Sequence, residues 1–135
     1  MIVKGLTPIL NVSDMQASFA WFGKLGWVKR WEWGTPPDFG AVGSGEFEIF
    51  LCLDGQGGRG KSALTTTRGI AESADNGVWM TIWVEDVDVI HRQCLEQGLE
   101  VTAAPADYPW NVREMHLRHP DGHVLRISRG IDETE

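Results

Sequence analysis

The segment Gly55–Ser62, with the sequence GQGGRGKS, matches the phosphate-binding loop pattern G-x-x-x-x-G-K-[ST]. Such a loop binds phosphate when a helix follows it at once, because the helix amides and the lysine then reach the same phosphate. Here Thr65, Thr66 and Thr67 follow, and three β-branched residues in succession disfavour a helix. The sequence therefore favours a linker or lid over residues 54–76 rather than nucleotide binding.

Histidines are the other residues that could bind a metal or transfer a proton, at positions 91, 116, 119 and 123. His116 and His119 are three residues apart on or beside a strand, so their side chains point to opposite faces, and His123 lies beyond a turn. No Ser-His-Asp or Cys-His arrangement can be assembled from local spacing, and Cys52 has no evident base. We therefore expect no catalytic residue, no metal site and no cofactor.

Tryptophan is unusually frequent, with seven in 135 residues. Large flat side chains that share a strand face give stacking area at low entropic cost, which is typical of pockets for aromatic ligands. Five tryptophans have such positions: Trp31 with Trp33, Trp79 with Trp83, and Trp110 close to Tyr108. The same spacing also suits a buried core, which is the interpretation favoured for Trp21 on a helix.

The secondary-structure elements that would position these side chains occur twice, as an internal repeat of the sequence. A shift of 72 residues aligns three pairs: Val12 with Val84, Asp14 with Asp86, and Gly26 with Gly98. Side-chain oxygens for the amides of a first helical turn can come from Ser13 or Asp14 in the first copy and from Glu85 or Asp86 in the second. Each glycine can adopt the left-handed conformation that ends a helix. The apolar residues between them recur at helical spacing: Met15, Phe19 and Phe22, and then Val87, Ile90 and Cys94.

Short strands are predicted around each helix, over residues 3–12, 27–33, 39–43 and 46–53, and again over 78–84, 99–103, 111–118 and 123–129. The chain is thus divided into a first βαβββ module (1–53), the linker (54–76) and a second βαβββ module (77–130). Neither four-stranded module can cover both faces of its sheet alone. We therefore expect one α+β domain in which both modules form a curved mixed sheet around a cleft, with the helices outside.

Composition and charge limit the function further. The formal charge of −7 argues against a nucleic-acid partner, and no apolar run approaches the roughly 20 residues of a membrane-spanning helix. The first ten residues do not resemble a signal peptide, so a cytoplasmic location is expected. Two free thiols, Cys52 and Cys94, are then favoured over one disulfide.

The doubled βαβββ order resembles the vicinal oxygen chelate superfamily, which holds glyoxalase, the ring-cleaving dioxygenases and the bleomycin resistance proteins. The resemblance covers about residues 4–129 and includes the strand exit NVSDM (11–15), its counterpart WVEDV (83–87) and the turn PDGHVL (120–125). It implies a homodimer. In the metal-using members, four ligands come from the first and last strand of each module, and these positions correspond here to Thr7, Phe50, Trp79 and Arg126.

None of these four side chains suits a divalent cation, which needs imidazole, carboxylate or thiolate donors, and Arg126 is itself a cation. The resemblance therefore points to the bleomycin resistance branch, whose members bind and sequester an antibiotic without metal or catalysis. The predicted ligand-binding residues are Thr7, Trp31, Trp33, Phe50, Cys52, Trp79, Thr81, Trp83, Trp110 and Arg126.

The leading hypothesis is metal-free sequestration of a bleomycin-like small molecule in an aromatic cleft. The ligand is expected to be aromatic and, because the surface is acidic, cationic. Arg126 is expected to pair with Glu48, or otherwise with a ligand carboxylate or phosphate. Two alternatives stay open: a metal-dependent lyase, isomerase or dioxygenase of the same fold, with its metal on residues such as Glu48 or His116, and a non-catalytic partner or sensor domain that binds a protein.

Overall fold

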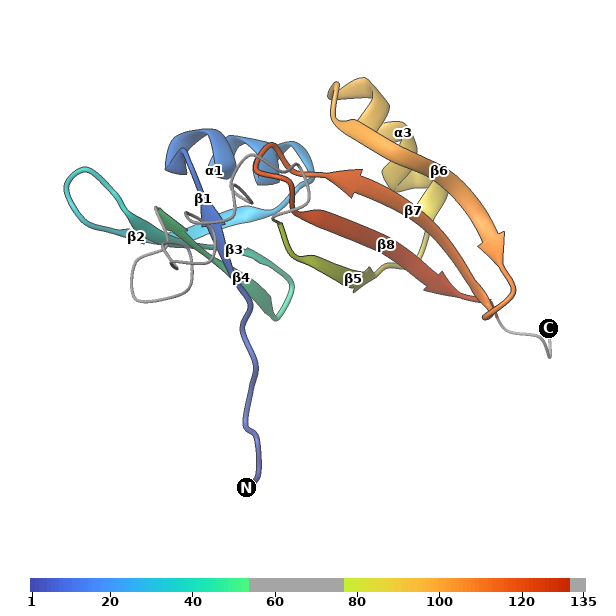
Figure 1. Cartoon of the computed structure of the whole chain (residues 1–135), viewed down its shortest axis with the longest axis horizontal. Coiled ribbons are helices and arrows are strands. Elements are labelled where there is room, and N and C mark those ends of the chain that lie inside the picture. The colour runs from blue at the N-terminus through green and yellow to red at the C-terminus, as the bar shows by residue number, and fades with distance from the viewer. Residues whose placement is uncertain (54–76, 132–135) are drawn as a thin grey trace, which may run out of the picture. The chain divides into compact units, whose positions relative to one another are not determined.

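The computed structural model describes residues 1–53 and 77–131, which form two compact units, one before and one after segment 54–76 in the sequence (Figure 1). Unit 1 contains residues 1–53 and unit 2 contains residues 77–131. The predicted linker or lid, its Gly55–Ser62 motif and the acidic tail beyond Ile131 lie outside the described residues.

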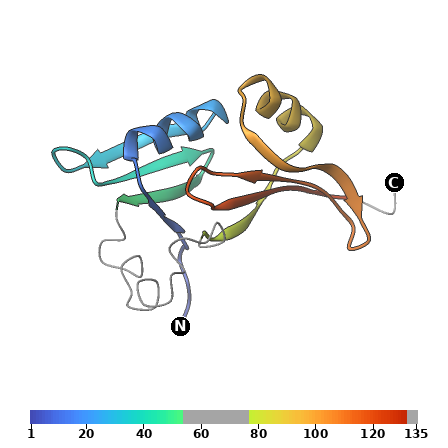
Figure 2. The same cartoon turned by 45° about the horizontal axis from the view of Figure 1, so that its top comes forward.

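Unit 1 consists of β1 (Ile9–Val12), α1 (Met15–Lys24), β2 (Val28–Trp33), β3 (Phe39–Ser44) and β4 (Phe47–Leu53). The strands pair in the order β1-β4-β3-β2, with β1 parallel to β4 and the other pairs antiparallel. The helix covers one face of this sheet, as Figure 2 shows.

Unit 2 repeats this arrangement with β5 (Trp79–Trp83), α3 (Val87–Glu96), β6 (Glu100–Tyr108), β7 (Val112–Arg118) and β8 (Val124–Gly130). Its strand order is β5-β8-β7-β6, and β5 is parallel to β8. The predicted α+β class and the doubled βαβββ order are confirmed. Hydrogen bonding joins the strands into two four-stranded sheets.

Both helices begin and end at the predicted residues because the same local chemistry is present twice. The Asp14 carboxylate accepts a hydrogen bond from the Ala17 amide at 2.9 Å, and the Asp86 carboxylate accepts one from the Val89 amide at 3.2 Å. Beyond the helices, Gly26 and Gly98 have φ angles of 87° and 70°, a region that side chains with a Cβ disfavour. Local signals therefore set both helix boundaries.

The core of each unit lies between the helix and one face of the sheet. In unit 1, Trp21 and Phe22 of the helix are buried with Ile49 and Leu51 of β4, and in unit 2 the core includes Val87, Cys94, Met115, Leu117, Leu125 and Ile127. Cys52 and Cys94 are both buried and form no disulfide, as predicted. Neither described helix is long and apolar enough to cross a membrane.

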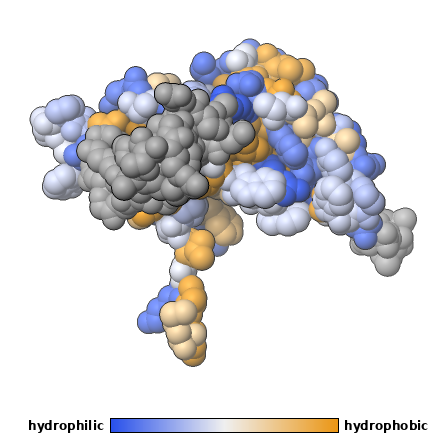
Figure 3. Space-filling view, viewed as in Figure 1, coloured by the Kyte–Doolittle hydropathy of each residue, from blue (hydrophilic) through white to orange (hydrophobic). Residues whose placement is uncertain are grey.

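Two predicted strands have different lengths in the structure. The first strand begins at Ile9 rather than at Val3, and Pro8, which has no N–H to donate, immediately precedes it. Residues 1–7 are exposed and carry apolar side chains on the surface, visible as orange atoms along the N-terminal stretch in Figure 3. The predicted strand 99–103 extends to Tyr108, because β6 is an edge strand that accepts Pro105 and two register shifts.

Candidate functional site

The face of each sheet turned away from its helix carries most of the predicted binding residues, and we call it the open face. Side chains two residues apart on a strand, or paired across neighbouring strands, lie on the same face of a sheet. In unit 2, Arg126 pairs with Thr81 on one side and His116 on the other. The open face of unit 2 therefore carries Trp79, Thr81, Trp83, Glu114, His116, Arg126 and Ser128.

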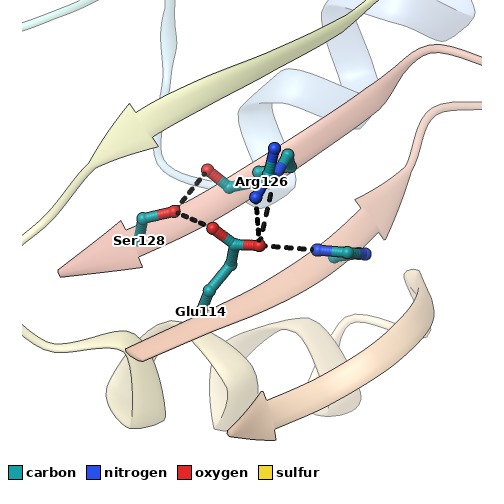
Figure 4. A network of polar contacts seen from close by, with 4 residues as sticks. Glu114, Arg126 and Ser128 are labelled. Carbon is teal, nitrogen blue, oxygen red and sulfur yellow. Dashed lines mark hydrogen bonds and ion pairs between the residues drawn. The ribbon is translucent and has the colours of Figure 1, made fainter. Parts of the chain in front are cut away.

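Glu114 is the centre of a polar network on this face (Figure 4). Its Oε2 atom accepts hydrogen bonds from Arg126, through Nε at 3.0 Å and Nη2 at 2.8 Å, and lies 2.9 Å from Nε2 of His116. Its Oε1 atom accepts a hydrogen bond from the Ser128 hydroxyl at 2.9 Å. Both carboxylate oxygens are therefore engaged by neighbouring side chains.

The electrostatics of Glu114 follow from this geometry. Its side chain is only 3% exposed, and this burial, the largest single influence, acts to raise the pKa of the carboxyl group. The hydrogen bonds from His116, Arg126 and Ser128, with the charge of Arg126, together outweigh burial and hold the pKa of Glu114 below its ordinary value. The network thus contains an ionised carboxylate held against a guanidinium.

Tryptophan side chains stand beside this network. The ring of Trp79 lies with its centroid 5.2 Å from the guanidinium carbon of Arg126, which is a cation–π contact. Trp79 is 71% exposed and Trp83, on the same face, is 65% exposed, while Thr81 between them is also exposed. These two indoles therefore offer large apolar area to a ligand.

A recess of about 270 Å³ lies next to Trp79 and is lined by Gly77, Val78, Trp79, Gly122 and Val124. The chain approaches itself closely here, since a Cβ added to Gly77 would lie 2.2 Å from the carbonyl oxygen of Gly122. The Val78 amide donates a hydrogen bond to Nδ1 of His123 at 3.0 Å, which fixes the entry into β5. The recess is close to the lower limit of known ligand pockets and can hold part of a ligand.

The open face of unit 1 is also aromatic. Trp31, Phe39 and Phe50 form a cluster with ring-centroid separations of 5.2 to 5.7 Å. Trp33 lies on the same face and is exposed. Cys52 also lies on this face, as the cross-strand partner of Phe39, but it is buried. Thr7, exposed ahead of β1, belongs to neither cluster.

Arg30 and Glu48 form a separate charged pair in unit 1. A register shift between Lys29 and Trp31 places Arg30 over Gly43, where Nη2 donates a hydrogen bond to the Gly45 carbonyl at 2.7 Å. Its Nη1 atom lies 3.8 Å from Glu48.

The predicted pairing of Arg126 with Glu48 is wrong. The ion-pair partner of Arg126 is Glu114. Glu114 lies on β7, two residues before His116, which is the cross-strand partner of Arg126. Glu48 belongs to the other unit and has Arg30 as its partner.

The structure thus sorts the predicted residues into groups. Trp79, Thr81, Trp83 and Arg126 share the open face of unit 2, and Trp31, Trp33, Phe50 and Cys52 share that of unit 1. Trp110 stacks on Tyr108, with centroids 4.9 Å apart, at the end of the β6–β7 hairpin. That end is where Val112 pairs with Gly130, several residue pairs away from Arg126.

Sequence reasoning missed Glu114 and Ser128 and treated His116 only as an alternative metal ligand. The signal was present in β7, where Glu114 and His116 alternate with the apolar residues Met115 and Leu117. This alternation predicts a polar face on that strand. It does not reveal which residue of another strand lies opposite.

The donor chemistry of the described residues does not fit a divalent metal ion. No group of three or more His, Cys, Asp or Glu side chains in residues 1–53 and 77–131 is arranged to hold one. Glu114 and His116 are adjacent donors, but the carboxylate already accepts from the cationic Arg126, which would repel a metal. The positions Thr7, Phe50, Trp79 and Arg126 provide no ordinary ligand.

Comparison with known proteins agrees with this geometry at the level of the fold. Residues 5–127 match the family model described as "Glyoxalase/Bleomycin resistance protein/Dioxygenase superfamily". A search of the curated proteins by sequence finds no match.

Similar solved structures include a bleomycin resistance determinant encoded on the transposon Tn5, with a TM-score of 0.69, 17% identity, and coverage of 95% of this chain and 98% of that one. TioX from Micromonospora sp. ML1 has a TM-score of 0.76, 16% identity, and coverage of 96% and 100%. A bleomycin-binding protein complexed with bleomycin has a TM-score of 0.68, 17% identity, and coverage of 95% and 99%. At these identities the likeness concerns the fold alone.

Proposed function

Since the chain belongs to the glyoxalase/bleomycin resistance protein/dioxygenase superfamily, we propose that it binds and sequesters a flat aromatic, antibiotic-type small molecule. Binding requires neither a metal nor a covalent step. The ligand stacks on the open face of unit 2. A homodimer, as the family resemblance implies, and a cytoplasmic location are part of this proposal.

The observation that carries the proposal is the pairing of an exposed indole with an oriented arginine, at positions where the family resemblance places ligands in the metal-using members. Arg126, at one of the positions where metal-using relatives have a ligand, is hydrogen-bonded to the buried Glu114. Trp79, at another such position, presents its ring to solvent directly beside it. An exposed indole is costly to leave in water and gains when a flat ligand covers it.

The solved structures support the same class of ligand. Two proteins of similar fold are described as a bleomycin resistance determinant and as a bleomycin-binding protein complexed with bleomycin. Within residues 1–53 and 77–131, no group of three or more His, Cys, Asp or Glu side chains is arranged to hold the metal that the enzymes of this fold would need. Sequestration is therefore the function that the side chains support best.

The proposal is tested by titrating the full chain with bleomycin and following tryptophan fluorescence and heat release. Binding should quench the emission, and Trp79→Ala should weaken the affinity about fivefold, which corresponds to the roughly 1 kcal/mol of one aromatic stacking contact. Phe47→Ala is the matched control, because Phe47 is an exposed aromatic residue outside both clusters. Equal weakening by both substitutions, or no binding of bleomycin or any flat aromatic probe, contradicts the proposal.

A further inference from the structure

Arg126 has hydrogen-bonding capacity beyond its pair with Glu114. Its Nε and Nη2 atoms donate to the Glu114 carboxylate, whereas Nη1, which carries two further N–H groups, has no hydrogen-bond partner among the described residues. The side chain is 24% exposed. The guanidinium therefore combines a fixed orientation, set by Glu114, with donors directed away from that carboxylate.

Glu114, by contrast, is largely inaccessible to a ligand. Its side chain is buried, and its two oxygens accept from Arg126, His116 and Ser128. A cationic ligand on this face would meet the Arg126 guanidinium before any carboxylate. The local chemistry is thus that of a hydrogen-bond donor, although the whole chain is acidic.

The position of Trp79 makes this donor useful for recognition. Its ring centroid lies 5.2 Å from the guanidinium carbon, and the exposed Thr81 is the direct cross-strand partner of Arg126. A flat ring that contacts Trp79 on the side of the guanidinium would bring an oxygen substituent within reach of Nη1. Arg is well suited to such an acceptor, because its planar donors match a carboxylate.

We infer that Arg126 determines specificity on the open face of unit 2 and selects flat aromatic ligands that carry a carboxylate. This inference rests on the proposed function and names its ligand class. This ligand class differs from the cationic ligand expected from the net charge of −7. Screening limits the effect of distant surface charges to about 8 Å at physiological salt, so the group in direct contact decides selectivity.

Three naphthalene probes of similar shape test the inference: 2-naphthoate, the neutral 2-naphthylmethanol and the cationic 2-naphthylmethylamine. Isothermal titration of the full chain should give an affinity for 2-naphthoate at least about tenfold higher than for the amine. Equal affinities, or tighter binding of the amine, overturn the inference. This measurement needs no variant.

The double variant Arg126→Gln with Glu114→Gln removes both partners together and leaves no buried charge alone. The ratio of naphthoate affinity to naphthylmethanol affinity should fall about tenfold. The matched control is Arg113→Gln with Asp88→Asn, an ion pair at 2.8 Å that links β7 to the helix of the same unit. It should leave that ratio unchanged, and an unchanged ratio in the Arg126 variant overturns the inference.

The outcomes separate this inference from the proposed function. Three probes that bind equally, and all more weakly to Trp79→Ala, leave the stacking function standing and refute the role of Arg126. Absence of binding by all three probes and by bleomycin refutes the stacking function itself.

Discussion

Arg126 of β8 donates two hydrogen bonds, at 3.0 and 2.8 Å, to one oxygen of Glu114 on the neighbouring strand β7. The two charges compensate each other at a place where Glu114 is removed from water. In such a pair, loss of one partner costs more than loss of both, because the remaining charge is left uncompensated. The pair therefore links the stability of unit 2 to the orientation of its candidate binding residue.

Glu114→Gln should lower the free energy of unfolding by about 3 kcal/mol, because it leaves Arg126 beside a neutral amide. Urea denaturation followed by circular dichroism measures the change. The control is Glu48→Gln, whose carboxylate is 3.8 Å from Arg30 with both side chains about one-third exposed. That substitution should cost less than about 1 kcal/mol, and equal losses for the two variants would contradict the assigned role of Glu114.

Gly77→Ala should destabilise unit 2, because the new Cβ would lie 2.2 Å from the Gly122 carbonyl oxygen, and backbone cannot move aside as a flexible side chain does. A loss of about 2 kcal/mol is expected from overpacking of this kind. Thermal unfolding can be compared with Gly130→Ala, where an added Cβ meets nothing within 4 Å. Similar midpoints for the two variants would show that the close approach at Gly77 is not needed.

His119 should make the stability of the protein fall in mild acid. Burial, helped by the charges of His123 and Arg118 and opposed by Asp121, lowers the pKa of His119 from its ordinary value of 6.5 to about 4. The unfolded chain therefore takes up the proton first. The stability that the neutral imidazole provides is present above pH 6.5 and is lost as the pH falls toward 4.

Between about pH 7.5 and pH 5 this single group should account for a loss of about 2 kcal/mol in the free energy of unfolding. Urea midpoints at the two pH values measure it. His119→Asn is the useful comparison, because its side-chain oxygen can replace Nδ1 as the acceptor of the Asp121 amide, a bond of 2.9 Å, without titrating. A pH dependence that persists unchanged in this variant would exclude His119 as its source.

Metal loading should be well below one equivalent per chain after incubation with zinc, nickel, manganese or iron and removal of the excess. The physical reason is the guanidinium of Arg126 at the Glu114 carboxylate, next to His116. Elemental analysis of the purified protein provides the measurement. Stoichiometric metal that is lost on substitution of Glu48 or His116 would instead support the metal-dependent enzyme of this fold.

The repeated architecture could be predicted because its signals are local. Asp14 and Asp86 cap their helices through amides only three residues away, and Gly26 and Gly98 adopt positive φ just beyond the helix ends. Such interactions join residues close together in the sequence, so the sequence alone is enough to predict them. The paired faces of Trp31 and Trp33, and of Trp79 and Trp83, follow from strand alternation in the same way.

The polar network could not be predicted, because it depends on register between strands. Glu114 and Arg126 meet only because β7 pairs with β8 such that His116 faces Arg126 and Glu114 faces Ser128. A shift of one residue would turn Glu114 toward the helix. The length of β6 was underestimated for a related reason, since Pro105 is acceptable only on an edge strand, and sequence alone does not show which strand is at the edge.

The parallel pairing of the first strand with the last in each unit has a consequence for synthesis on the ribosome. Ile9 of β1 pairs with Phe50 of β4, and Trp79 of β5 pairs with Val124 of β8. Each first strand is therefore synthesised well before the strand with which it pairs. Such long-range pairing is slow to form. Truncation ahead of Val124 would leave both β5 and β7 with an unpaired edge, so a nascent chain acquires its Arg126 face only with its last strand.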